Sequence, residues 1–143
     1  MADYRKLEVW LAGRRLAVMA YRFTEALPRS EIYNLCSQIQ RASVSVPANI
    51  AEGAGRGSDR DFARFVRISI GSLNELDTLI QIANDLELAP ENDDLSEAIR
   101  DLAVRLRNLA TRLEQQSVRE ATATYRVSSE QPSAIESYDS NES

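Results

Sequence analysis

The stretch that decides the fold runs from Gln38 to Leu76 and reads QIQRASVSVPANIAEGAGRGSDRDFARFVRISIGSLNEL. Apolar residues recur every three or four positions on both sides of a glycine-rich segment, which is typical of two amphipathic helices joined by a short corner. The first side carries Ile39, Ala42, Val46 and Ile50, and the second carries Phe62, Phe65, Val66, Leu73 and Leu76. The pattern therefore predicts a helical hairpin.

Proline and glycine shape this hairpin. Pro47 cannot donate a helical hydrogen bond and crowds the preceding turn, so we expect a kink in the first of the two helices. Gly53 is predicted to end that helix, and Gly55 and Gly57 permit the turn conformations of the corner. Ser58, with an acidic residue three positions later, forms a capping box that predicts the start of the next helix.

The rest of the chain continues the helical pattern, and we expect helices over residues 4–26, 31–52, 59–86 and 93–116. The last of them has the cleanest apolar stripe, with Leu95, Ile99, Leu102, Leu106, Leu109 and Leu113. Short connections place consecutive helices antiparallel, so the prediction is an all-α, up-down-up-down four-helix bundle over residues 1–117. Residues 118–143 are rich in Ser, Thr and Glu, which predicts a disordered acidic tail.

Composition excludes several kinds of site. The 143 residues predict one domain with one core. The chain has no His and a single Cys, which excludes a disulfide framework and a His/Cys metal centre. Cys36 lies in register with Ile32 and Ile39 and is interpreted as a buried core thiol. No leader peptide and no long apolar run is present, which favours a cytoplasmic protein without a membrane partner.

No arrangement of residues predicts catalysis. The segment Gly53–Gly57 follows a helix and lacks the Gly-Lys-Ser/Thr ending of a phosphate-binding loop. A carboxylate-bridged metal site in a bundle requires Glu-x-x-His pairs, which a chain without His cannot supply. We therefore expect no enzymatic activity, no cofactor and no small-molecule substrate.

Charge is unevenly distributed along the chain. Residues 5–67 contain eleven Lys or Arg against six Asp or Glu, whereas residues 68–117 contain four against ten. A basic first half and an acidic second half could meet head to tail between copies and close a ring.

A basic group near the corner is the best candidate for a binding site and consists of Arg56, Arg60, Arg64 and Arg67. Arg60, Arg64 and Arg67 recur at helical spacing on the flank opposite the inward-facing phenylalanines. With Arg56 in the corner, they could form a positive ridge for RNA or another phosphate-bearing partner. The alternative is an ordinary charged face, or salt bridges between subunits.

A second polar set consists of Arg41, Asn49, Glu52 and Glu75. In one interpretation these residues are solvated flank positions. In the other, Arg41 and Glu75 form a semi-buried ion pair that specifies the register of two helices, and Asn49 binds backbone freed by the proline.

Several motifs are more specific than periodicity. They occur in the order Leu7–Trp10, Tyr21, Glu31–Leu35, Gln38–Ala42, Val46–Gly53, Arg64-Phe65, Gly71-Ser72 and Glu75-Leu76. Together they resemble the bacterial four-helix bundle proteins encoded by intervening sequences of 23S ribosomal RNA genes, and Pro47–Gly53 is the most specific element. The resemblance covers residues 4–113. Gln40 stands where the family often has a second Arg, and Ala54 where a bulkier residue is common.

The resemblance implies a homopentamer with a central channel. It also implies a relationship to the accessory protein of diversity-generating retroelements, which binds nucleic acid and a reverse transcriptase. We therefore expect a non-enzymatic, ring-forming scaffold or adaptor whose partner is structured RNA, a ribonucleoprotein or a reverse-transcriptase-like protein. The alternative is a purely protein–protein interaction module without affinity for nucleic acid.

Overall fold

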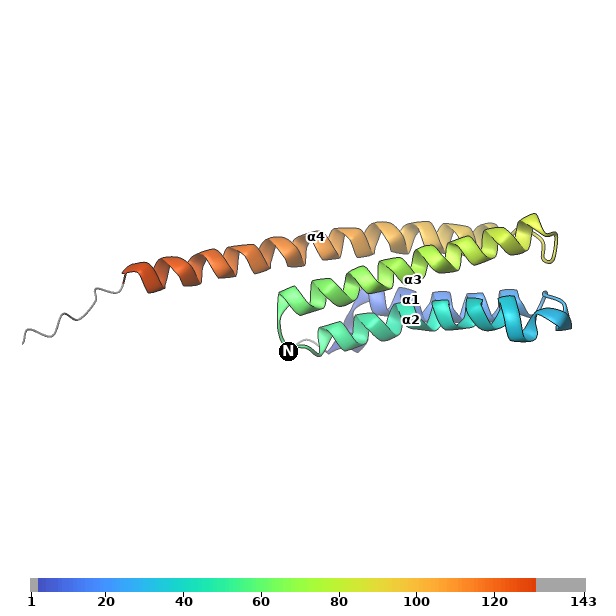
Figure 1. Cartoon of the computed structure of the whole chain (residues 1–143), viewed down its shortest axis with the longest axis horizontal. Coiled ribbons are helices and arrows are strands. Elements are labelled where there is room, and N and C mark those ends of the chain that lie inside the picture. Colours follow the sequence, from blue (N-terminus) through green and yellow to red (C-terminus); the bar gives the residue numbers. More distant parts are fainter. Residues whose placement is uncertain (1–2, 131–143) are drawn as a thin grey trace, which may run out of the picture.

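The computed structural model describes residues 3–130, which form an elongated bundle in which consecutive long helices run in opposite directions (Figure 1). The long helices are α1 (Glu8–Thr24), α2 (Ser37–Ala54), α3 (Asp59–Asp85) and α4 (Asp93–Glu130). The described residues contain no strand. This arrangement confirms the predicted all-α four-helix bundle.

The core lies where the apolar stripes of the four helices meet. Its fully buried large side chains include Leu16, Ile39, Ile50, Leu73, Leu76, Ile80, Leu95, Leu102 and Leu106. Burying each such side chain contributes roughly 1.5–3 kcal/mol, which makes this interior the main source of stability. The predicted stripe on α4 is confirmed, since five of its six members are buried and Leu109 packs partly buried against them.

The entry to α2 differs from the predicted single helix over residues 31–52. A short 3-10 turn, Arg29–Glu31, is followed by a wide π turn, Ile32–Cys36, before regular α-helix begins. The Glu31 carboxylate accepts a hydrogen bond from the Leu35 amide at 3.3 Å and caps this turn. Because a π turn adds a residue to the helical repeat, Ile32 is half-exposed instead of facing the core as expected.

Pro47 lies in the middle of α2, and the helix continues through it to Ala54. On one side a Cβ added at Gly13 of α1 would lie 3.4 Å from the Pro47 Cβ, so α1 passes close to the proline. On the other side the Ser69 hydroxyl of α3 donates to the Val46 carbonyl at 2.9 Å. The proline turn is thus packed between two helices, and its expected kink stays a prediction.

The corner between α2 and α3 differs from the expectation in one detail. The helix ends at Ala54 rather than at Gly53, and the capping residue Gly55 has right-handed backbone angles that other residues also adopt. Gly57 has a φ of +83°, where only glycine is free of strain. Ser58 caps α3 as predicted, and its hydroxyl accepts from the Asp61 amide at 3.1 Å.

Gly53 is required for packing instead of for a turn. A Cβ placed there would lie 2.5 Å from the Cβ of Phe65 on α3, closer than two non-bonded carbon atoms can approach. The backbone of α2 at Gly53 therefore packs directly against the side chains of Phe62 and Phe65 on α3.

The end of α4 corrects a prediction. The helix was expected to stop near residue 116 and give way to a disordered tail, but it continues through Glu130 and projects beyond the other helices (Figure 1). Every side chain from Val118 to Glu130 is exposed, so no core packing supports this part of the helix. The rest of the predicted tail, residues 131–143, lies outside the described residues, and the domain boundary at residue 117 stays a prediction.

We predict that Gly53→Ala lowers the free energy of unfolding by about 1–3 kcal/mol, because the new methyl group must push α2 away from α3. Denaturant unfolding followed by circular dichroism measures this change. The matched control is Gly55→Ala, where the added Cβ has no neighbour closer than 3.4 Å and the expected change stays within about 0.5 kcal/mol. Equal effects of the two substitutions would contradict the close contact.

Candidate functional site

The arginines at the corner are held by neighbours within the chain. The Arg56 guanidinium lies 2.7 Å from the Glu52 carboxylate and 4.9 Å from the centre of the Phe65 ring. Arg64 lies 4.8 Å from the centre of the same ring and 3.9 Å from the Asp61 carboxylate. Cation–π contacts of this kind hold two guanidinium groups on one aromatic side chain. The structure thus brings two of the four predicted arginines together.

Arg67 is directed elsewhere. Its guanidinium donates two hydrogen bonds to the Glu114 carboxylate, at 2.9 and 3.1 Å, and so links α3 to α4. Arg60 is exposed and forms no ion pair among the described residues. Because three of the four arginines have a carboxylate within 4 Å, the group is less positive than its sequence indicates.

Within the second polar set the suggested ion pair between Arg41 and Glu75 does not form, and Glu52 pairs with Arg56 instead. Arg41 and Glu75 are both exposed, and no ion pair joins them in residues 3–130. The Asn49 side-chain amide donates to the Ser45 carbonyl at 2.8 Å, whereas the carbonyl that Pro47 leaves without its amide donor is that of Ser43. The solvated-flank interpretation therefore describes Arg41 and Glu75.

Neutral hydroxyl contacts join α2 to α3 instead. The Ser45 and Ser72 hydroxyls lie 2.8 Å apart, and Ser69 binds the Val46 carbonyl. Ser69, Gly71 and Ser72 form a run of small side chains in the middle of α3, which permits a close helix contact but does not specify which groups bond. Gly71, in the same run, is exposed, and a Cβ added there would meet no atom within 4 Å.

The other residues that could take part in catalysis or bind a metal are buried or dispersed. Cys36 is buried, as predicted, and burial together with the nearby negative charge of Glu31 raises the pKa of its thiol. Within the described part of the chain, no three potential metal ligands cluster. None of the described helices combines the length and the apolar character needed to span a bilayer.

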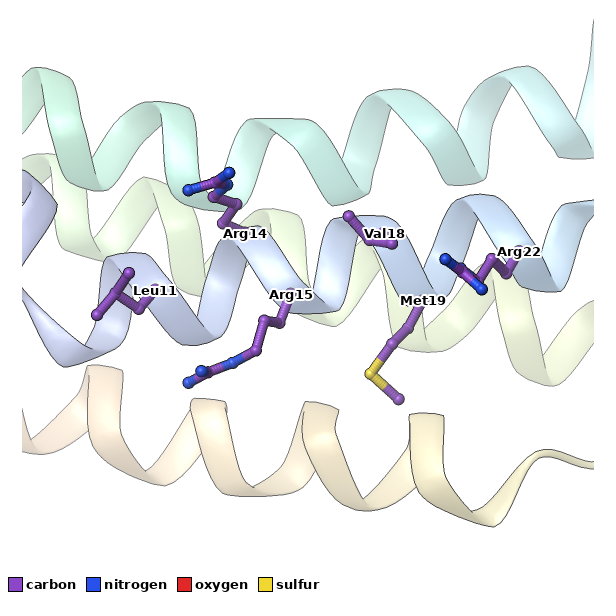
Figure 2. A pocket seen from close by; sticks show the side chains of 6 residues that line it. All are labelled: Leu11, Arg14, Arg15, Val18, Met19 and Arg22. Carbon is purple, nitrogen blue, oxygen red and sulfur yellow. The ribbon is translucent and has the colours of Figure 1, made fainter.

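Two shallow apolar grooves flank α1. One, of about 550 Å³, is lined by Leu11, Arg14, Arg15, Val18, Met19 and Arg22 (Figure 2). Figure 2 shows the Arg14 side chain directed toward α2, and Arg15 and Met19 directed toward α4. The other groove, of about 460 Å³, lies between α1 and α2 and is lined by Arg14, Ala17, Val18, Tyr21, Arg22, Val44 and Pro47.

Both grooves lie beside the part of the apolar face of α1 that the core does not cover. Val18 is 51% exposed and Tyr21 is 45% exposed. The signal in the sequence was the width of that face, which exceeds what one helix can bury in a four-helix core. The apolar residues of α1 beyond the buried stripe remain at the surface, where they form an apolar patch between arginines.

The Arg67–Glu114 contact makes stability depend on pH. Hydrogen bonds from Arg67 hold the pKa of the Glu114 carboxyl below its usual value. A lowered pKa in the folded state means that the pair stabilises the fold above the carboxyl's unfolded pKa of about 4.3. This stabilisation is lost as the pH falls through the folded-state pKa.

We predict that Arg67→Gln raises the pKa of Glu114 toward its usual value, as measured by carboxyl NMR titration. The control is Arg105→Gln, which removes the partner of Asp101 at 3.2 Å on α4 and leaves the Glu114 titration unchanged. Identical Glu114 titrations in the wild type and in Arg67→Gln would show that the bidentate contact does not persist in solution.

Comparison with known proteins shows the family to which the chain is related. Residues 5–112 match the family described as 23S rRNA-intervening sequence protein, and this range includes α1, α2, α3 and about the first half of α4. No match to a curated protein was found. Since the match spans most of the 143 residues, the chain belongs to the 23S rRNA-intervening sequence protein family.

Proposed function

We propose that this protein is a non-enzymatic, self-assembling helical bundle that serves as a scaffold or adaptor, with a homopentameric ring as its assembled form. The observation that carries this proposal is the apolar surface on α1, α2 and α3. Val18, Tyr21 and Val44 are 51%, 45% and 45% exposed and surround one groove, and Ile68 and Ile82 are exposed on α3. Apolar side chains exposed on neighbouring surfaces of a folded bundle favour a protein interface.

The absence of histidine supports a non-enzymatic role, because the commonest general base is unavailable. The one thiol is buried in the core, with its Sγ 3.8 Å from the Thr24 carbonyl, and is out of reach of a substrate. The number of subunits and the central channel rest on the family resemblance alone.

Self-assembly predicts that the full chain has a mass of several copies in solution, five by the family resemblance. Size-exclusion chromatography with multi-angle light scattering, over a range of protein concentrations, measures it. A mass of one chain at every concentration would overturn the scaffold proposal.

RNA binding is a second candidate function, favoured by the corner arginines. Arg56 and Arg64 lie on the Phe65 ring, and exposed Arg60 has no carboxylate partner among the described residues. Contacts with the phosphate backbone would make such binding strongly dependent on salt. A ribonucleoprotein or reverse-transcriptase-like partner, implied by the resemblance, stays a prediction.

If RNA binds at the corner, the triple substitution Arg56→Gln, Arg60→Gln, Arg64→Gln weakens retention of a structured RNA hairpin. The slope of log affinity against log salt should fall by about one for each arginine that contacts phosphate. The control triple Arg100→Gln, Arg107→Gln, Arg119→Gln removes the same charge from exposed positions of α4 and leaves both values unchanged. Equal losses in both triples, or no salt-sensitive retention by the wild type, would favour the purely protein–protein alternative.

A further inference from the structure

A line of exposed residues runs along the outer edge of α3. Ile68 and Ile82 are 43% and 41% exposed, and Glu75 lies midway between them, seven residues from each. Residues seven apart are stacked on one side of a helix, so the three form a continuous apolar–acidic–apolar line, which we call the α3 ridge.

The α3 ridge lies on the side of α3 nearest α2. Ile68 and Glu75 are four residues before and three residues after Ser72, which places all three on one face of the helix. The Ser72 hydroxyl lies 2.8 Å from the Ser45 hydroxyl of α2. Added methyl groups at neighbouring Gly71 would meet no atom within 4 Å, so the chain itself leaves this edge uncovered.

The groove between α1 and α2 has complementary features. Val18, Tyr21 and Val44 contribute apolar surface, and Arg14 and Arg22 lie at its margins. The two arginines are eight residues apart, which corresponds to about 12 Å along the helix. We call this surface, of about 460 Å³, the α1–α2 groove.

The charges on the two surfaces are unmatched within one chain. Glu75, Arg14 and Arg22 are exposed, and none of them forms an ion pair among the described residues. Arg14 has only an aromatic neighbour, with its guanidinium 5.6 Å from the centre of the Trp10 ring. By contrast, Arg56, Arg64 and Arg67 each have a carboxylate nearby. The ridge therefore presents the unpaired carboxylate of Glu75 between two isoleucines. The groove presents the unpaired guanidinium groups of Arg14 and Arg22 beside an apolar surface.

We propose that the α3 ridge of one copy docks into the α1–α2 groove of a second copy of this chain. Glu75 pairs with the groove arginines, and an adjacent isoleucine enters the apolar floor formed by Val18, Tyr21 and Val44. Opposite charges across the contact select the partner and its register. This inference rests on the proposed self-assembly and identifies the two surfaces that produce it.

The positions of the two surfaces on the bundle determine how successive copies would be arranged. The groove lies between α1 and α2, and the ridge lies on α3 beside α2, so the two occupy neighbouring sides of the bundle that meet at α2. Because ridge and groove are different surfaces, each copy binds one neighbour through each of them. Copies joined through neighbouring sides are rotated relative to one another at every step, and they form a ring where that rotation closes after a whole number of copies.

Reversal of the charges tests the contact in the full chain. Glu75→Arg alone, and the pair Arg14→Glu with Arg22→Glu, each place like charges in the interface and should raise the dissociation constant between copies at least about tenfold. The triple variant carrying all three changes restores opposite charges and should bring the dissociation constant back to within about threefold of wild type. Sedimentation equilibrium measures these constants.

Two control variants, Glu97→Arg and Arg107→Glu, reverse charges at exposed positions of α4 and should assemble like the wild type. Circular dichroism of every variant verifies that it folds, and all five should show the wild-type helix content. A monomeric wild type would overturn both the self-assembly and the docking. A wild type that assembles, combined with charge reversals that act no differently from the controls or a triple variant that stays dissociated, would overturn the docking alone and assign the groove to another partner.

Discussion

The contact between α2 and α3 is the constraint on which the rest of the bundle depends. At Gly53 the helices approach so closely that an added Cβ would lie 2.5 Å from the Cβ of Phe65. Farther along, hydroxyl groups continue the contact, with Ser69 on the Val46 carbonyl and Ser45 beside Ser72. A larger residue at any of these positions would separate the helices, because a packed interior accommodates little added volume.

This close pairing decides what remains for the other two helices. α1 packs beside Pro47 through Gly13, and it buries only part of its broad apolar face, which leaves Val18 and Tyr21 at the surface. α4 completes the core as far as Leu113 and then continues as an unpacked helix. The grooves and the exposed extension therefore arise because the four helices that share one core differ in length and in the width of their apolar faces.

The location of available charge also follows from the fold. The corner has the densest arginines in the sequence, yet neighbouring carboxylates and the Phe65 ring occupy most of them. The arginines of the α1–α2 groove have no such partners among the described residues. An unpaired charge beside apolar surface contributes more to recognition than a charge already neutralised by its own chain, since the latter must first break an existing contact.

The sequence by itself determined the helices, their order and the core, because a repeat of three to four residues places apolar side chains on one face whatever the neighbours are. It also determined the buried state of Cys36 and the cap at Ser58, which depend on residues nearby in the chain. Only the tertiary structure showed that Ile32 turns outward through a π turn, that Arg67 binds Glu114, and that α4 extends beyond the core. These features depend on contacts between residues far apart in the chain or on small differences in local backbone energy, neither of which periodicity encodes.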